Sequence, residues 1–176
     1  MSRGILIAGV GNIFFGDDAF GVEVVRLMQS RPAQQRVVVR DFGIRGIDLA
    51  YTLLDNWDAV ILVDALPRGG TPGTLYVLEP DLDHIRGSLP DSVVNTHGMD
   101  PVTVLRLAFS LGEVRAQVFV VGCEPADFGD ELEGRVGLSA PVQSALAEAA
   151  TMIEQFVERI AAKPVLITEE IVEVES

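Results

Sequence analysis

The stretch ILIAGVGNIFFGDDAFG, residues 5–21, combines the signals that decide the fold. It opens with a short apolar run at residues 5–8, which predicts a buried strand. Glycines and two acids follow, and from residue 20 to Met28 apolar side chains recur every three or four positions, as in an amphipathic helix. A strand that passes through a tight loop into a helix is the first half of a βαβ unit.

The rest of the chain repeats this alternation. Continuous apolar runs predict further buried strands at residues 37–39, 60–63 and 118–121. A run that alternates more between apolar and polar residues, at 74–78, predicts an edge strand. Helical spacing predicts helices at about 47–54, at 101–111 between the cap Asp100 and Gly112, and from 139 to just before Pro164. The prediction is a three-layer α/β/α fold of the phosphorylase/hydrolase-like kind, with a mostly parallel twisted sheet of about five strands. Residues 1–162 form its single domain and residues 163–176 an acidic C-terminal tail.

The composition limits the class of partner. A chain of 176 residues, 48% of them hydrophobic, fits one globular domain. Its formal charge of −13 argues against nucleic acid and anionic membranes, and favours a cation or a basic or metal-loaded partner, although acidity alone also keeps a protein soluble. The single cysteine, Cys123, suits a reducing compartment, and the N-terminal apolar run is too short to span a membrane. We therefore expect a cytoplasmic protein.

Ligands of open α/β sheets bind outside the carboxyl ends of the strands, and polar residues stand at these positions in the sequence. The acids after the strands are Asp17, Asp18, Asp41, Asp64 and, beside Cys123, Glu124. His97 stands in a polar loop just before the helix at 101, and the other histidine, His84, is interpreted as an ordinary exposed residue. Acidic groups and one imidazole are thus expected to converge on one edge of the sheet.

This set of side chains is consistent with a metal site. Asp64 follows an apolar strand, so it needs either a cation or nearby backbone amides to cap. Of Asp17 and Asp18, one is expected to cap the following helix and the other to bind metal. Carboxylates combined with a neutral imidazole suit zinc or nickel, and three ligands with open positions are typical of catalytic metal centres.

These motifs, in this order, resemble those of the hydrogenase maturation proteases. The resemblance covers roughly residues 4–160 and rests on the following segments: GVGNI at 9–13, DDAFG at 17–21, DFGIRG at 41–46, VDA at 63–65, the histidine before a helix, VGCEP at 121–125 and GLS at 137–139. Each motif is weak alone, but the ordered set is specific.

The resemblance implies an endopeptidase that removes the C-terminal extension of a nickel-loaded [NiFe]-hydrogenase large-subunit precursor. It implies that Asp18, Asp64 and His97 are both the metal ligands and the catalytic residues, and that Asp41 and Gly43 help to recognise the substrate. The nickel would come with the precursor, and no organic cofactor would be needed. We expect the metal to polarise the scissile carbonyl for attack by water, with Asp18 or Asp64 as the base.

Three other functions remain open at this point. A non-catalytic nickel-binding chaperone of the same pathway would use the same ligands. A dinucleotide-binding oxidoreductase would use Gly9 and Gly11, but its third glycine would fall at Phe14. A cysteine hydrolase would pair Cys123 with His97, although a cysteine after an apolar strand is more often a small core residue.

Overall fold

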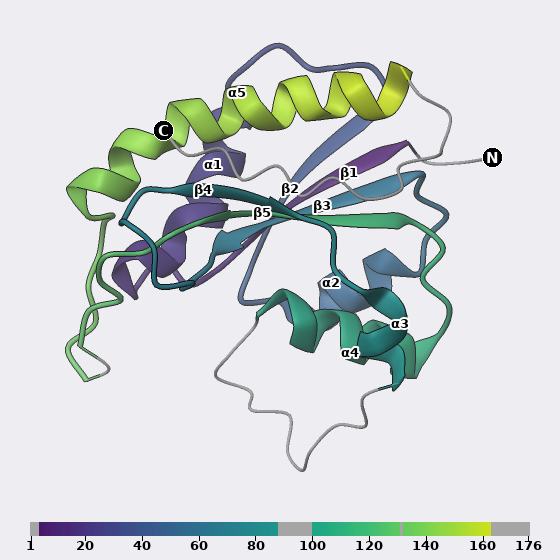
Figure 1. Ribbon diagram of the computed structural model, residues 1–176, viewed down its shortest axis with the longest axis horizontal. Coiled ribbons are helices and arrows are strands. Elements are labelled where there is room, and N and C mark those ends of the chain that lie inside the picture. The colour runs from purple at the N-terminus through teal and green to yellow at the C-terminus, as the bar shows by residue number, and fades with distance from the viewer. Residues whose placement is uncertain (1–3, 88–99, 131, 163–176) are drawn as a thin grey trace.

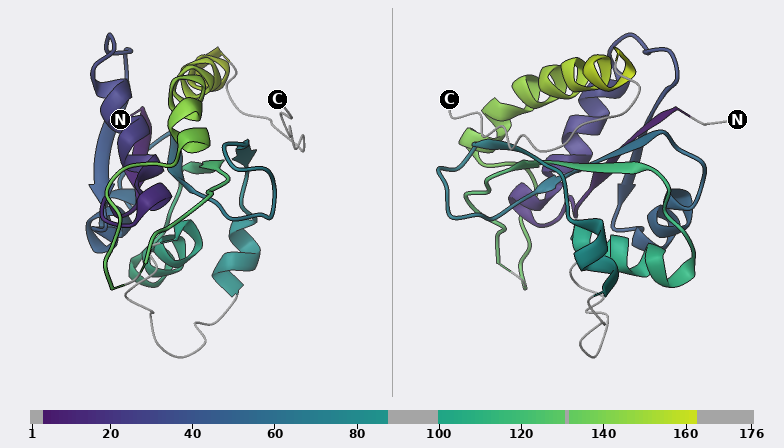
Figure 2. Two further views of the ribbon diagram at one scale, coloured as in Figure 1. Left: turned by 90° about the vertical axis from the view of Figure 1, so that its left-hand side faces the viewer. Right: turned by 45° about the vertical axis from the view of Figure 1, so that its right-hand side comes forward.

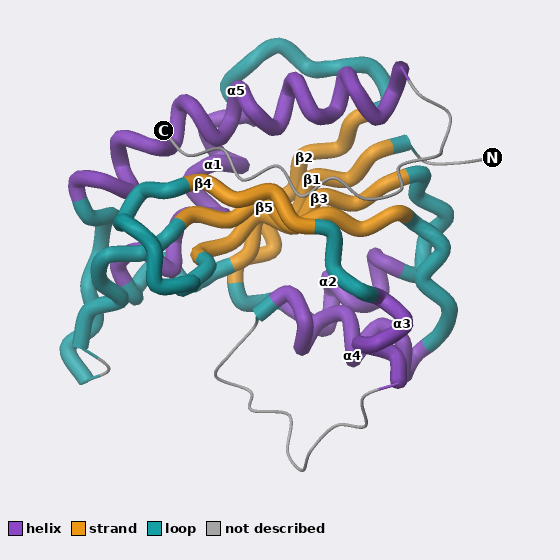
Figure 3. The backbone as a smooth tube through the Cα atoms, viewed as in Figure 1, coloured by secondary structure: helices purple, strands orange, loops and turns teal. Residues whose placement is uncertain are grey.

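The computed structural model describes residues 4–87, 100–130 and 132–162. Five strands of this part form one sheet in the order β2-β1-β3-β5-β4 (Figure 1; Figure 3). The strands are β1 (Ile5–Val10), β2 (Val37–Gly43), β3 (Ala59–Ala65), β4 (Leu75–Leu78) and β5 (Gln117–Cys123). Four of them run parallel, and β4 pairs antiparallel with β5 at one edge. The mostly parallel sheet and its edge strand are therefore confirmed.

Helices cover both faces of the sheet, which makes three layers (Figure 1; Figure 2). One face carries α1 (Phe20–Gln29) and α5 (Ala140–Ala162), and the other carries α2 (Gly46–Leu53), α3 (Leu82–Gly87) and α4 (Pro101–Leu111). Because side chains alternate along a strand, Ile7 packs with the first pair of helices whereas Leu6 packs with the second group. The central strands are thus buried on both faces, which explains their continuous apolar sequences.

Local boundaries differ from the prediction at the functional edge. Strands β2 and β3 continue as far as Gly43 and Ala65, so Asp41 and Asp64 belong to the strands and not to the loops after them. The reason is that backbone pairing with the neighbouring strand persists, with Asp64 opposite Gly122. A short 3-10 helix, η1 (Gly16–Ala19), also precedes α1. No helix in the described ranges is long and apolar enough to cross a membrane, and the predicted tail at 163–176 lies outside those ranges.

Two glycines let α1 lie directly on the sheet. A Cβ atom on Gly21 would overlap the carbonyl oxygens of Val63 and Val10, and one on Gly9 would overlap the carbonyl oxygen of Gly21. The backbone of α1 therefore touches the ends of β1 and β3 with no side chain between them. This contact fixes where η1 sits relative to Asp64.

The Gly21→Ala substitution should destabilise the protein by roughly 1–3 kcal/mol, because the added methyl group must push α1 away from backbone atoms that cannot move independently. Urea unfolding followed by circular dichroism measures this change. Gly87→Ala is the matched control, since a Cβ there meets no atom within 4 Å, and it should leave the unfolding midpoint unchanged or slightly raised. Equal midpoints for the wild type and Gly21→Ala would show that the contact is not tight.

Candidate active site

Asp18 is folded back over the end of β1. Gly11 has a φ of +129°, and a Cβ on it would overlap the backbone carbonyl oxygen of Asp18, so this turn requires glycine. The amide of Asn12 donates a hydrogen bond to Asp18 Oδ2 at 2.7 Å. Burial raises the pKa of the Asp18 carboxyl, and this single hydrogen bond offsets the effect only in part.

The pKa of Asp64 is shifted more strongly than that of Asp18. Its side chain is 6% exposed at the end of β3, and its Oδ1 accepts a hydrogen bond from the amide of Ala65 at 2.8 Å. Burial raises the pKa of Asp64 well above its usual range, and the negative charges of Asp18 and Asp100 raise it further. Within the described residues, no Lys or Arg forms an ion pair with Asp64 or Asp18. In this part of the chain, the fold therefore holds two neighbouring carboxylates that no basic side chain pairs with.

Asp17, next to Asp18 in sequence, differs from Asp18 and Asp64 because many donors surround its carboxylate. Its buried carboxylate accepts four hydrogen bonds: from the amides of Ala126 and Asp127 and from both the amide and the hydroxyl of Ser139, at 2.7–3.0 Å. Burial alone would raise the pKa of Asp17, but these four donors bring it below its usual value. Asp17 is thus a structural anchor that ties the loop after β5 to η1. It does not cap the helix that follows it, as one of the two acids was expected to do.

Glu124 is a second structural acid at the same edge. Its carboxylate accepts hydrogen bonds from the amides of Arg68 and Gly69 and from the hydroxyl of Tyr76, at 2.8–3.1 Å. Burial would raise the pKa of Glu124, yet these donors lower it. The acids at this edge therefore divide into two that accept many hydrogen bonds, Asp17 and Glu124, and two that accept few, the half-buried Asp18 and the buried Asp64. Poorly compensated carboxylates are the ones expected to bind a cation.

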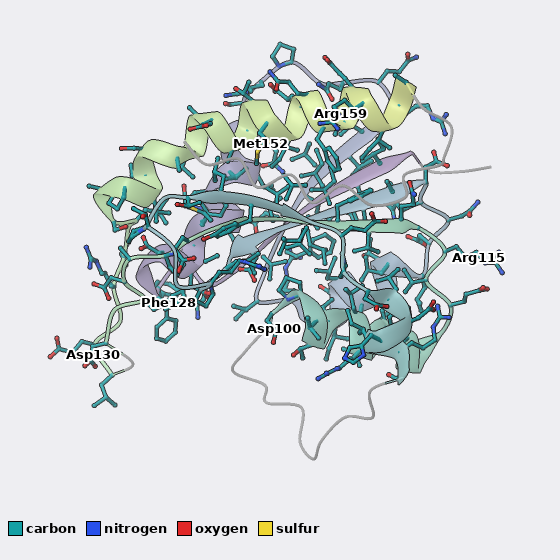
Figure 4. All side chains as sticks on the ribbon, in the orientation of Figure 1. Asp100, Arg115, Phe128, Asp130, Met152 and Arg159 are labelled. Atoms are coloured by element: carbon teal, nitrogen blue, oxygen red, sulfur yellow. The ribbon has the colours of Figure 1, made fainter. Side chains whose placement is uncertain are left out.

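The predicted third ligand, His97, lies outside the described residues. Within residues 4–87, 100–130 and 132–162, no group of three His, Cys, Asp or Glu side chains is arranged to hold a metal ion. Asp100, three positions after His97 in the sequence, caps α4 by accepting a hydrogen bond from the amide of Thr103 at 3.0 Å (Figure 4). The negative charge of Asp100 raises the pKa of Asp64, so the chain enters α4 near Asp64. His84 is exposed on α3, in agreement with its interpretation as a surface residue.

Asp41 and Gly43, the predicted recognition residues, end the neighbouring strand β2. The carbonyl oxygen of Gly43 accepts a hydrogen bond from the amide of Gly11 at 3.1 Å, which connects β2 to the loop that carries Asp18. Asp41 Oδ2 lies 3.8 Å from Arg26 Nε, and its side chain is 33% exposed. Their position at the same edge is established, and their role in recognition stays a prediction.

Comparisons with known proteins agree on one family. The family model described as hydrogenase maturation protease (HycI) matches residues 22–156, which include Asp64 and position 97. The hydrogenase expression/formation protein HupM of Azotobacter chroococcum mcd 1 is 34% identical over 159 residues, which are 88% of this chain and 73% of HupM. A putative hydrogenase maturation protease of Methanocaldococcus jannaschii is 31% identical over 152 residues, 86% of this chain and 94% of its own. The chain belongs to the hydrogenase maturation protease family.

Solved structures agree with this assignment. The hydrogenase-maturating endopeptidase HybD from E. coli superimposes with a TM-score of 0.69 at 23% identity, over 90% of this chain and 93% of HybD. The hydrogenase 2 maturation peptidase from a Thaumarchaeota archaeon superimposes with a TM-score of 0.63 at 26% identity, over 88% of this chain and 97% of its own. The α/β/α fold of this hydrogenase maturation protease is therefore shared with proteins of the same family.

Two alternative functions conflict with the geometry. Burial raises the pKa of the Cys123 thiol to about 12, and the charges of Asp17 and Glu124 add to the effect, so a nucleophilic thiolate is strongly disfavoured near neutral pH. The close approach that Gly11 permits, which a dinucleotide-binding loop would offer to a pyrophosphate, is taken by the backbone of Asp18. Neither a cysteine hydrolase nor a dinucleotide-binding oxidoreductase fits this hydrogenase maturation protease.

Replacing Asp64 by Asn should stabilise the protein at neutral pH. The folded-state pKa of Asp64 is raised, so its ionisation opposes folding once the pH exceeds about 3.9, the ordinary value for an aspartate. In the presence of a chelator, urea unfolding should give a higher midpoint for Asp64→Asn than for the wild type at pH 7. The difference should shrink as the pH falls toward 4. A variant that is less stable than the wild type at pH 7 would contradict the assigned environment.

Replacing Asp17 by Asn should have the opposite effect. The folded-state pKa of Asp17 is lowered, so its carboxylate stabilises the fold at neutral pH, and this contribution is lost as the pH falls through the folded-state pKa. We expect a loss of roughly 1–3 kcal/mol at pH 7 for each buried donor left without an acceptor. Asp83→Asn is the control, because that side chain is 95% exposed. Equal unfolding midpoints for Asp17→Asn and Asp83→Asn would refute the structural role.

Proposed function

We propose that this protease removes the C-terminal extension of a nickel-loaded [NiFe]-hydrogenase large-subunit precursor, with Asp18, Asp64 and His97 as metal ligands and catalytic residues. The observation that carries the proposal is the pair Asp18 and Asp64, two carboxylates of raised pKa at the carboxyl edge of the sheet, of which the charge of Asp18 acts on Asp64. A divalent cation beside them would remove the cost of holding both charges there. The matched family supports the peptidase activity.

The donor set fits nickel that arrives with the precursor. Two carboxylates and one imidazole leave coordination positions open for groups of the substrate. Bound there, the cation would act as a Lewis acid on the carbonyl of the scissile peptide bond. The carboxylates would orient the substrate through this cation, and whichever of Asp18 and Asp64 has a free oxygen would accept the proton of the attacking water. Asp41 and Gly43 would form part of the wall that the precursor contacts.

The net charge and the cysteine content of the chain support the proposed partner and its compartment. A formal charge of −13 suits a partner that brings a cation and disfavours nucleic acid and anionic membranes. One buried cysteine without a disulfide suits a reducing compartment, so we place the processing reaction in the cytoplasm.

Each of the substitutions Asp18→Ala, Asp64→Asn and His97→Ala should slow precursor cleavage by at least about a hundredfold, because even residues that only support metal ligands cost up to about that much. Purified enzyme is incubated with nickel-loaded precursor, and intact mass spectrometry follows the loss of the C-terminal peptide. His84→Ala, at an exposed position on α3, should keep the wild-type rate.

Normal cleavage by any of the three ligand variants would reject that residue as a ligand. A wild-type enzyme that binds the nickel-loaded precursor and never changes its mass would instead indicate a nickel-binding chaperone of the same pathway.

A further inference from the structure

Exposed apolar side chains gather at the end of the molecule that carries Asp18 and Asp64. The described residues include nine large hydrophobic side chains that are exposed: Phe14, Ile44, Ile47, Tyr51, Val102, Leu111, Phe128, Leu132 and Val136. Seven of them lie in loops that follow strands or in the first turn of the next helix, which is the carboxyl end of the sheet. Leu111, at the last residue of α4, lies at the opposite end. Isolated exposed apolar residues are ordinary, but a one-sided distribution suggests a contact surface.

Four of the nine belong to one projection and the loop beneath it. We call residues 126–130 and 132–137, between β5 and α5, the finger; it extends beyond the sheet at the lower left of Figure 1. Phe128 and Val136 are 38% and 79% exposed, and Leu132 is 96% exposed. Phe14, 60% exposed, belongs to the loop on which the finger rests. Figure 4 shows Phe128 turned away from the sheet and Asp130 near the far end of the finger.

The finger is held firmly beside the candidate site. The amide of Arg135 donates to the carbonyl oxygen of Phe14 at 2.7 Å, and the amide of Gly16 donates to the carbonyl oxygen of Arg135 at 2.8 Å. The buried carboxylate of Asp17 adds the bonds to Ala126 and Asp127 described above. Because Asp17 and Asp18 are adjacent in η1, the finger has a fixed place relative to the catalytic acids.

The charges of the finger indicate what it contacts. Asp127, Asp130 and Glu133 are acidic, and the one base, Arg135, is already paired with Asp127. The matching surface therefore presents apolar side chains surrounded by Lys or Arg. A second copy of this chain is a poor match, since it carries the same acids and a formal charge of −13.

We propose that Phe14 and the finger are a docking surface for the folded body of the precursor protein, separate from the metal ligands that act on its C-terminal end. This inference rests on the proposed function for the identity of the partner. The precursor's contact region would be apolar with a basic border. Apolar side chains in the centre of such a contact supply most of the binding energy, and the charges supply the rate of association.

The test compares the double variant Leu132→Asp/Val136→Asp with Leu111→Asp. All three positions are exposed apolar residues, so the substitutions should leave the fold intact, and Leu111 is the matched control at the far end. Binding to immobilised nickel-loaded precursor is measured by biolayer interferometry, and cleavage by intact mass. The double variant should bind at least about tenfold more weakly, with the loss in KM and not in kcat, whereas Leu111→Asp should bind as the wild type does.

Equal affinity of the wild type and the double variant for the precursor would overturn the docking surface. If that equal affinity comes with a dimer-to-monomer change in sedimentation velocity, the finger is instead a self-association surface. If the wild-type enzyme binds the precursor and fails to cleave it, the proposed activity is wrong, yet the comparison of affinities still tests the finger.

Discussion

The direct contact between the backbone of α1 and the ends of β1 and β3 is the constraint on which the site depends. Gly9 and Gly21 allow this contact, and Gly11 allows the loop between them to return over the sheet. A side chain at any of these positions would push η1 outward and separate Asp18 from Asp64. The glycines in the first segment of the chain therefore bring two carboxylates together, whereas in a dinucleotide-binding loop they would make room for a phosphate.

The second principle is the unequal supply of hydrogen-bond donors at one edge of the sheet. Asp17 and Glu124 are each satisfied by backbone amides and a hydroxyl, and their charges stabilise the surrounding loops. Within the described residues, Asp18 and Asp64 accept one hydrogen bond each, so their negative charges oppose folding. A pair of carboxylates that costs stability by itself is what the proposed recognition of a metal-loaded substrate would require, because a cation brought by the partner would remove that cost.

Much of the fold could be predicted from the sequence because its central strands are buried on both faces and read as unbroken apolar runs. The cap at Asp100 and the edge strand β4 had equally local signals. The choice between Asp17 and Asp18 had no local signal, since the groups that donate hydrogen bonds to Asp17 lie 109 to 122 positions away along the chain. It was the likeness to a known family that selected Asp18. The finger, η1 and the partners of Glu124 likewise depend on contacts between distant segments.

The central claim is that Asp18 and Asp64 share one divalent cation with His97. Anomalous diffraction at the nickel absorption edge, on crystals soaked in nickel, tests it most directly. The account predicts a single strong peak within bonding distance of both carboxylates and of the imidazole. Nickel bound elsewhere, with no peak between Asp18 and Asp64, would contradict it.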